Sequence, residues 1–291
     1  MDARVTLTDT RVSVVMMTRD RREQALRSLA RLTALPESPR IILVDNGSAD
    51  GTGEAVGHAF PAVTVLAPGR NLGGAARTLG VQAATTPYVA FSDDDSWWAP
   101  GALARAADHF DAAPRLGLLA ARLLVGAQEG LDPVCREMAA SPLPQHSDLP
   151  GPSVLGFLAC GAVVRRRAYL QVGGFHPVIF FCGEETVLAQ DLAAAGWGLS
   201  YVDDVVAHHH PQLGPERGHR RRLQARNAVL SSWLRRPLPV ALAHTATALG
   251  SGADRPEVFD LARRLPTALI ARQPLPNEVE RQVRRLESPH G

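Results

Sequence analysis

The segment Tyr88–Asp95, with the sequence YVAFSDDD, begins as a short apolar run and ends in three carboxylates. Its apolar part follows a Thr-Pro pair and predicts a buried strand. Three adjacent anions repel one another, so a folded chain keeps them together with a compensating cation or with full solvation. Because alternate side chains of an extended segment share a face, we expect Asp93 and Asp95 to point together and Asp94 to point away.

Two carboxylates on one face present oxygen ligands to a hard divalent metal ion that carries a diphosphate. The alternative is an acidic turn after an edge strand, because the Asp-x-Asp pattern is common. The neighbouring segments of the chain favour the metal site.

Three apolar runs precede this strand, at residues 11–18, 41–44 and 63–66, and each ends in a polar loop. Continuous apolar strands are typical of a sheet that is covered on both faces, as parallel α/β sheets are. Apolar residues at helical spacing follow the first run, and an alanine-rich helix follows the third. The repetition of strand, loop and helix predicts a Rossmann-like, mostly parallel open sheet, whose ligands bind at the carboxyl ends of the strands.

The second half of the chain is less regular. We expect a strand at 116–125, a mobile loop at 126–153, a strand at 155–164, a helix from Glu184 to about residue 195, and a short strand at 199–202. From about residue 214 the pattern changes to Arg-rich, Pro-interrupted helices. We therefore predict an α/β domain at 1–213 and a C-terminal helical appendage at 214–291.

The composition is that of an ordinary globular protein, with 45% hydrophobic and 21% charged residues over 291 positions. The net charge of +2 argues against nucleic acid as a partner. No apolar run reaches the roughly 20 residues that span a bilayer, and no signal-peptide core follows the N-terminus. Cys135, Cys160 and Cys182 are scattered and odd in number, as free thiols are. These features predict a cytoplasmic protein that does not span a membrane.

Five stretches, in order over about residues 11 to 210, resemble the motifs of family 2 glycosyltransferases with the GT-A fold. They are Val14–Arg21, Val44–Thr52, Asn71–Gly74, Asp93–Asp95, and Gly173–Phe175 with the later Gly183–Glu185 and Gly196-Trp197. The second stretch is the most specific, and the others gain weight from their order. Arg226-Asn227 after a basic helix further resembles the bacterial rhamnosyl- and galactofuranosyltransferase branch.

The resemblance implies a nucleotide-sugar site at the ends of the first two strands. Asp45 would accept a hydrogen bond from the base or ribose, as strand-end carboxylates do in nucleotide sites, and its alternative role is to cap the next helix. Thr18 and Arg21 would line the nucleotide pocket. For Arg21, a solvated surface charge fits the sequence nearly as well.

Four residues of the next loop and helix would complete this pocket. Arg70, Asn71 and Gly73 occupy the place where the family closes over the nucleotide. Arg77 would also bind the nucleotide sugar. It departs from the family pattern, which more often continues towards an Ala-Arg-Asn triplet.

The carboxylate triplet would hold both the donor and a divalent metal ion, Mg²⁺ or Mn²⁺. The resemblance implies that Asp93 contacts the ribose, that Asp95 binds the metal and its diphosphate, and that Asp93 and Asp94 border the donor. His208 matches a position that supplies a third metal ligand in many relatives, and His210 is the other candidate. The alternative for either histidine is a satisfied surface or core residue.

Basic and aromatic side chains nearby are candidates for the donor and the acceptor. Arg226 and the run Arg220–Arg222 form a basic face that would meet the donor diphosphate or an anionic lipid-linked acceptor, and we assign Arg226 to the nucleotide sugar. For the run, a solvated helix face explains the sequence slightly better. Trp97 and Trp98 would stack on a sugar, or be buried in the core.

Two adjacent carboxylates, Glu184 and Glu185, open the predicted helix after Gly183. On a helix they diverge by about 100°, so only one aims squarely at an acceptor hydroxyl. The resemblance places the general base second in the pair, which assigns it to Glu185. Glu184 would then be a capping or metal-shell residue.

The predicted function is therefore inverting, metal-dependent transfer of a sugar from a nucleoside-diphosphate donor, a UDP- or dTDP-sugar, to an acceptor hydroxyl. The acceptor would be a glycan, a lipid-linked glycan or a small-molecule natural product. We further expect a homodimer and a cytoplasmic location that includes the inner face of the membrane. The alternatives are a nucleotidyltransferase, disfavoured because residues 18–21 lack the glycine of a phosphate loop, and a catalytically silent sugar-nucleotide-binding subunit.

Overall fold

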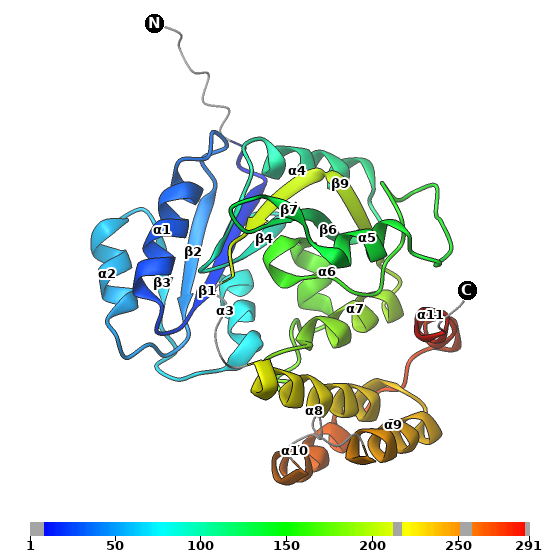
Figure 1. The fold of residues 1–291 in the computed structure, drawn as a ribbon. Helices are drawn as coiled ribbons and strands as arrows, with labels where there is room; N and C mark the ends of the chain where they lie inside the picture. The colour runs from blue at the N-terminus through cyan, green and yellow to red at the C-terminus, as the bar shows by residue number, and fades with distance from the viewer. Residues whose placement is uncertain (1–8, 212–216, 251–257, 289–291) are drawn as a thin grey trace, which may run out of the picture.

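The computed structural model describes residues 9–211, 217–250 and 258–288. Within these residues the strands form one sheet in the order β3-β2-β1-β4-β8-β6-β9-β5, with β7 paired to β6 (Figure 1). The strands are β1 Val12–Thr18, β2 Arg40–Asp45, β3 Thr64–Leu66, β4 Tyr88–Asp93, β5 Ser96–Trp98, β6 Leu116–Val125, β7 Gly130–Leu131, β8 Ala162–Arg165 and β9 Gly198–His209. The helices are α1 Arg22–Thr33, α2 Thr52–Ala59, α3 Ala76–Ala83, α4 Ala102–Ala112, α5 Pro133–Ala139, α6 Arg166–Gln171, α7 Glu184–Ala194, α8 Arg217–Arg235, α9 Leu238–Gly250, α10 Val258–Ile270 and α11 Asn277–Glu287.

Strand β1 lies at the centre of the parallel half of the sheet. It pairs in parallel with β2 and β4, and β2 pairs in parallel with β3. The chain moves outwards from β1 to β3 and then returns to β4 on the other side of β1. Right-handed crossovers therefore place α1 and α2 on one face and α3 on the other. The register sets Thr18 beside Asp45 and Met17 beside Asp93, so three polar strand ends meet at one edge.

The other half of the sheet is mixed. Strand β8 is antiparallel to β4 and β6, β9 is parallel to β6, and β5 is antiparallel to β9. The predicted α/β class with an open sheet and flanking helices is confirmed. The central strands are buried on both faces, as their apolar sequences require: Val14, Val15, Met16 and Phe91 have no exposed surface.

Residues 126–153 are more regular than predicted, because they contain β7 and α5. The side chain of Asp132 accepts a hydrogen bond from the amide of Val134, and Pro133 occupies the first turn. Both are helix-start signals, so the prediction of a loop without regular structure is wrong here. The strand predicted at 155–164 is also shorter, because a 3₁₀ turn at Ala159–Gly161 precedes β8.

Strand β9 extends far beyond the predicted residues 199–202. Its pairing with β6 jumps from Val202 to Val206, and the intervening residues, which include Asp203 and Asp204, form a bulge. This acidic bulge interrupts the sequence alternation but not the strand. The strand therefore continues to His209 and carries part of the histidine run to the edge of the site.

The C-terminal helices pack on the α/β domain from one side (Figure 1). Helices α8 and α10 share an apolar cluster with Val178, Ile179 and Val187 of the preceding domain, and α11 packs near α7. The predicted helical appendage is present, and its predicted boundary at 213/214 lies outside the described residues. No helix in the described ranges is both long and apolar enough to cross a bilayer.

Candidate active site

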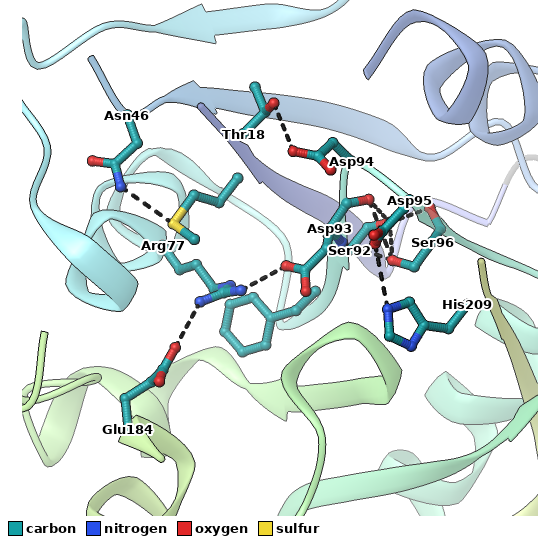
Figure 2. Close-up of polar contacts among 12 residues, drawn as sticks. Thr18, Asn46, Arg77, Ser92, Asp93, Asp94, Asp95, Ser96, Glu184 and His209 are labelled. Carbon is teal, nitrogen blue, oxygen red and sulfur yellow. Dashed lines mark hydrogen bonds and ion pairs between the residues drawn. The ribbon is translucent and has the colours of Figure 1, made fainter. Parts of the chain in front are cut away.

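The three carboxylates of the triplet point to three different partners (Figure 2). Asp93 lies 2.6 Å from Nη2 of Arg77, Asp94 accepts a 2.9 Å hydrogen bond from Oγ1 of Thr18, and Asp95 lies 3.4 Å from Nε2 of His209. The prediction assumed an extended segment through Asp95, and that assumption is wrong. The chain leaves the extended conformation after Asp93, and Asp94 and Asp95 form the turn into β5.

Serine side chains hold this turn in place. Oγ of Ser96 accepts a 2.7 Å hydrogen bond from the amide of Asp93, and Oγ of Ser28 donates to the carbonyl oxygen of Asp94 at 2.8 Å. Burial, followed by the charge of Asp95, raises the pKa of Asp94 to about 7. The turn thus carries more negative charge than its neighbours neutralise, which suits a bound cation.

Arg77 joins the triplet to the start of α7. Its side chain is 2% exposed, and its two Nη atoms lie 2.6 Å from Asp93 and 3.3 Å from Glu184. Burial alone lowers the pKa of this guanidinium, but the charges of Asp93 and Glu184 outweigh burial and raise the pKa above its ordinary value. Arg77 is therefore a buried bridge between two strand- and helix-end carboxylates. Its Nε and Oε2 of Glu184 are buried without a hydrogen-bond partner among the described residues.

Helix α7 begins at Glu184, directly after Gly183 in the left-handed region with φ of 92°. Glu184 approaches the loop before α3 so closely that a Cβ on Gly74 would lie 2.6 Å from its Oε1. Glu185 is half-buried, and Arg77 and its own backbone amide favour its ionised form. Burial, and next the charge of Glu184, outweigh them and raise the pKa of Glu185 to about 8. A carboxylate with a pKa near neutrality is suited to accept a proton.

Asn46, for which the sequence predicts no role, ties the loop after β2 to the loop before α3. Its Nδ2 donates to Oδ1 of Asn71 at 3.0 Å and to the carbonyl of Gly73 at 3.2 Å, and its Oδ1 accepts from the amide of Leu72 at 2.8 Å. Gly73 has a φ of 63°, and a side chain there would overlap the carbonyl of Phe180. The sequence signal for this role of Asn46 is its position directly after Asp45, in a polar loop at the end of a strand.

Asp45 hydrogen-bonds to the start of the next helix, although Gly51 and not Asp45 occupies the N-cap position. Its carboxylate accepts from the amides of Ser48 at 2.9 Å and Gly53 at 3.0 Å, at the start of α2.

Arg21 and Arg70 differ in their surroundings. Nη1 of Arg21 is buried without a partner among the described residues, whereas Arg70 is exposed. Binding of the nucleotide by these residues stays a prediction.

The histidine run alternates across the end of β9. His208 stacks on Trp97 with 5.4 Å between ring centroids, and the His210 ring lies 4.6 Å from Trp97. His209 points the other way, to Asp95, and this carboxylate outweighs burial and raises the pKa of His209. The histidine side chain that contacts the triplet is therefore His209, and metal binding by His208 or His210 stays a prediction. The alternation would have revealed it, had the length of β9 been known.

A family model described as "Glycosyl transferase family 2" matches residues 13–173, which hold β1 to β4 and the triplet. The chain belongs to this glycosyltransferase family. A rhamnosyltransferase of Mycobacterium tuberculosis, "N-acetylglucosaminyl-diphospho-decaprenol L-rhamnosyltransferase", is 31% identical over 221 residues, 65% of this chain and 71% of the relative. A pre-mycofactocin glycosyltransferase of the same organism is 33% identical over 190 residues, 62% of this chain and 40% of the relative.

Solved structures show the same GT-A fold. A mannosyltransferase from Pyrobaculum calidifontis, in complex with GDP-Man and Mn²⁺, matches with a TM-score of 0.58 and 22% identity, over 90% of this chain and 73% of that chain. S. aureus TarS 1-349 in complex with UDP-GlcNAc matches with a TM-score of 0.57 and 16% identity, over 94% of this chain and 84% of that chain. The predicted GT-A glycosyltransferase is confirmed.

The donor set of this glycosyltransferase fits a metal ion only in part. Asp95 and His209 offer one carboxylate and one imidazole side by side. No group of three or more His, Cys, Asp or Glu side chains that could hold a metal occurs within the described ranges. A divalent ion here would take its other ligands from phosphate oxygens and water, as Mg²⁺ commonly does.

Arg226 lies outside the acidic cluster, although the sequence assigned it to the donor. It is 3% exposed, pairs through Nη1 with Asp260 of α10, and donates to Oδ1 of Asn227 at 2.9 Å. Asn227 in turn donates from Nδ2 to the carbonyls of Phe181 and Cys182, both at 2.6 Å. These residues of α8 thus hold the segment that leads into Glu184 and Glu185.

That segment has an unusual backbone. Phe180 and Cys182 have positive φ values of 68° and 70°, which cost non-glycine residues energy unless the surroundings enforce them. Arg264 of α10 adds a further donor, from Nη1 to the carbonyl of Val178 at 3.2 Å. The C-terminal helices therefore help to shape the active site.

Trp98 is buried, and its Nε1 donates to the carbonyl of Phe91, so it is a core residue.

Proposed function

We propose that this glycosyltransferase moves a sugar from a nucleoside-diphosphate sugar to an acceptor hydroxyl with inversion, and that Glu185 is the general base. The observation that carries the proposal is the place of the Glu185 carboxylate, directly after Glu184 in the bridge of Asp93, Arg77 and Glu184, where burial raises its pKa to about 8. A base with a pKa near the working pH removes a proton most effectively. A single displacement with one base gives inversion.

The donor would occupy the carboxyl ends of β1, β2 and β4. Thr18 and Asp45 end neighbouring strands, and the unpartnered Nη1 of Arg21 suits a phosphate oxygen. Asn71 and Gly73 would close over the nucleotide from the loop that Asn46 holds. Solved structures of the same fold are complexes with GDP-Man, UDP and UDP-GlcNAc, which supports a nucleotide sugar here. We propose a UDP- or dTDP-sugar.

Asp95 and His209 would hold a divalent cation, Mg²⁺ or Mn²⁺, against the donor diphosphate. When bound, such an ion supplies Lewis-acid stabilisation of the charge on the leaving diphosphate. Asp93 does not need that role, because Arg77 already pairs with it. Asp93 is then free to orient the ribose through its second oxygen, and Arg77 keeps Glu184 away from the acceptor.

Glu185 would accept the proton of the acceptor hydroxyl as the oxygen attacks the anomeric carbon. The bond from that carbon to the diphosphate breaks as the new glycosidic bond forms, and the nucleoside diphosphate leaves. The rhamnosyltransferase relative is named for a decaprenyl-diphosphate acceptor, which supports a lipid-linked glycan as the acceptor class. The three cysteines are free thiols, which supports a reducing, cytoplasmic site of action.

The test combines donor binding and transfer. A panel of UDP-, dTDP- and GDP-sugars is scored by protection against thermal unfolding, with and without Mn²⁺, and the protecting donor is then offered a polyprenyl-diphosphate-linked glycan. We expect metal-dependent protection by one class of donor and release of its nucleoside diphosphate on transfer. Protection without turnover on any acceptor would instead favour a sugar-nucleotide-binding subunit, and the absence of protection by every donor would contradict the proposal.

A further inference from the structure

Helices α9 and α10 carry most of the large apolar side chains that are exposed in the described residues. Phe259 is 85% exposed and Ile270 is 88% exposed, which is extreme for side chains of this size. The others on these helices are Leu238, Leu242, Val258 and Leu269. Clustered exposure of this kind marks an interaction surface, whereas single exposed apolar residues are ordinary.

Helix α9 has no charged residue in its sequence LPVALAHTATALG. Its buried side faces α8, where His244 contacts Ser232. Its exposed positions are Leu238, Pro239, Leu242, Ala243, Ala246, Thr247 and Gly250. A helix at a protein–water boundary ordinarily carries polar or charged residues on its outer side. The outer side of α9 is therefore suited to contact an apolar surface and not bulk water.

Helix α10 has an apolar stripe along its outer side. Phe259, Arg263, Pro266 and Ile270 are exposed at steps of four, three and four residues, so they share one side over about 16 Å of helix. Its inner side carries Leu261 and Ala268, which are buried against α8. Figure 1 shows α9 and α10 on the side of α8 that faces away from the sheet. We call the exposed sides of these two helices the α9–α10 face.

The exposed charges near the α9–α10 face are positive. Several arginines of this region are not part of this charge, because Arg226, Arg235 and Arg236 are buried and paired with carboxylates. Asp260 pairs with Arg226 and Arg264 and, at 3.3 Å, also with Arg263. Arg221 and Arg263 are exposed, and Arg220 is exposed on the side of α8 that contacts Cys182. An apolar face with a rim of arginines complements a bilayer whose headgroups are anionic.

We propose that the α9–α10 face docks the glycosyltransferase on the surface of an anionic lipid bilayer. Phe259, Ile270 and Leu242 enter the boundary between headgroups and acyl chains, and Arg263 and Arg221 contact lipid phosphates. A second copy of the chain fits this face less well, because a symmetric contact would bring two arginine-rich rims together. The docking is peripheral, because the apolar residues lie on one side of each helix.

The docked orientation has a consequence for the site. Helix α8 and the inner side of α10 hold residues 178–182, which lead into the catalytic pair. The bilayer would therefore lie about one helix diameter, roughly 10 Å, beyond the helix that supports this segment. An acceptor that is anchored in lipid would be delivered near the site that uses it.

The experiment measures binding of the full chain to vesicles by flotation, without donor or acceptor. Its outcome is therefore independent of the proposed transfer reaction. Vesicles of phosphatidylcholine with about one third phosphatidylglycerol are compared with pure phosphatidylcholine. We expect binding to the anionic vesicles, about tenfold weaker binding for the double variant Phe259→Ser/Ile270→Ser, and weaker binding for Arg263→Glu.

Leu286→Ser is the matched control, because Leu286 is an exposed apolar residue on α11, away from the face. It should bind vesicles like the unmodified chain, and all variants should unfold at closely similar temperatures because the side chains are exposed. Absence of binding to anionic vesicles, or equal loss in the Leu286→Ser control, would overturn the proposal. It would also be overturned if light scattering showed a dimer that Phe259→Ser/Ile270→Ser converts to a monomer.

Discussion

Arg77 of α3 contacts Glu184 of α7 across 107 residues of sequence, with 3.3 Å between Nη1 and Oε1. Its other nitrogen, Nη2, pairs with Asp93 at the end of β4. One buried cation therefore sets the distance between the carboxylate triplet and the start of α7. The site is assembled by this bridge, and the following predictions depend on it.

Arg77→Met should destabilise the protein and remove activity. It leaves Glu184 and Asp93 without their cation, and breaking a buried ion pair costs about 3 kcal/mol or more. The free energy of unfolding from urea titration and the transfer rate measure the two effects. Arg70→Met is the control, because Arg70 is exposed, and it should leave the unfolding free energy nearly unchanged. Equal stability of the two variants would show that the bridge contributes nothing.

His209→Ala should weaken the affinity for Mn²⁺ in the presence of donor about tenfold or more, because it removes the imidazole beside Asp95. His208→Ala is the matched control on the opposite side of β9, where the ring stacks on Trp97. Its metal affinity should stay close to that of the unmodified chain. The dependence of transfer on Mn²⁺ concentration measures both. A larger effect at His208 would reverse the assignment.

Asn227→Ala should lower kcat by about ten- to hundredfold while the KM for the donor changes little. Asn227 lies on α8 and fixes the carbonyls of Phe181 and Cys182 ahead of Glu184 and Glu185. Asn277→Ala, at an exposed position on α11, is the control. A variant that raises the donor KM with kcat intact would place Asn227 in the donor site instead.

The strands of the nucleotide half were predictable because each is a continuous apolar run with a polar end. Parallel pairing then brings Thr18, Asp45 and Asp93 to one edge without further information. The directions in which the three aspartate side chains point were not predictable. They depend on a turn at Asp94 and Asp95, and the sequence contains no recognisable signal for this turn.

Contacts between distant segments could not be predicted from the sequence either. Glu184, the partner of Arg77, lies 107 residues away in the chain. Arg226 was predicted to bind the donor, but the packing of α8 on α10 pairs it with Asp260 instead. His209 was missed because the bulge after Val202 hid the length of β9. The helix start at Asp132 and Pro133 was visible, since its capping residues stand next to one another.

Glu185→Gln should change the pH dependence of stability. The folded-state pKa of Glu185 is about 8, above its ordinary value of 4.5, so the folded protein holds a proton that the unfolded chain releases between these values. Stability of the unmodified protein therefore falls as the pH rises through this window, and the variant lacks that loss. Urea midpoints at about pH 5 and pH 8.5 measure the effect. An identical pH dependence in both proteins would contradict the raised pKa.

The most direct test of the mechanism is single-turnover transfer by Glu185→Gln, with donor and Mn²⁺ affinities measured on the same protein. Glu184→Gln, at the adjacent residue, is the matched variant for comparison. We expect Glu185→Gln to bind donor and metal normally and to lose about 10²–10⁴-fold in the rate of transfer, as loss of a positioned base does. Normal turnover by Glu185→Gln, together with an inactive Glu184→Gln, would contradict the assignment of Glu185 as the base.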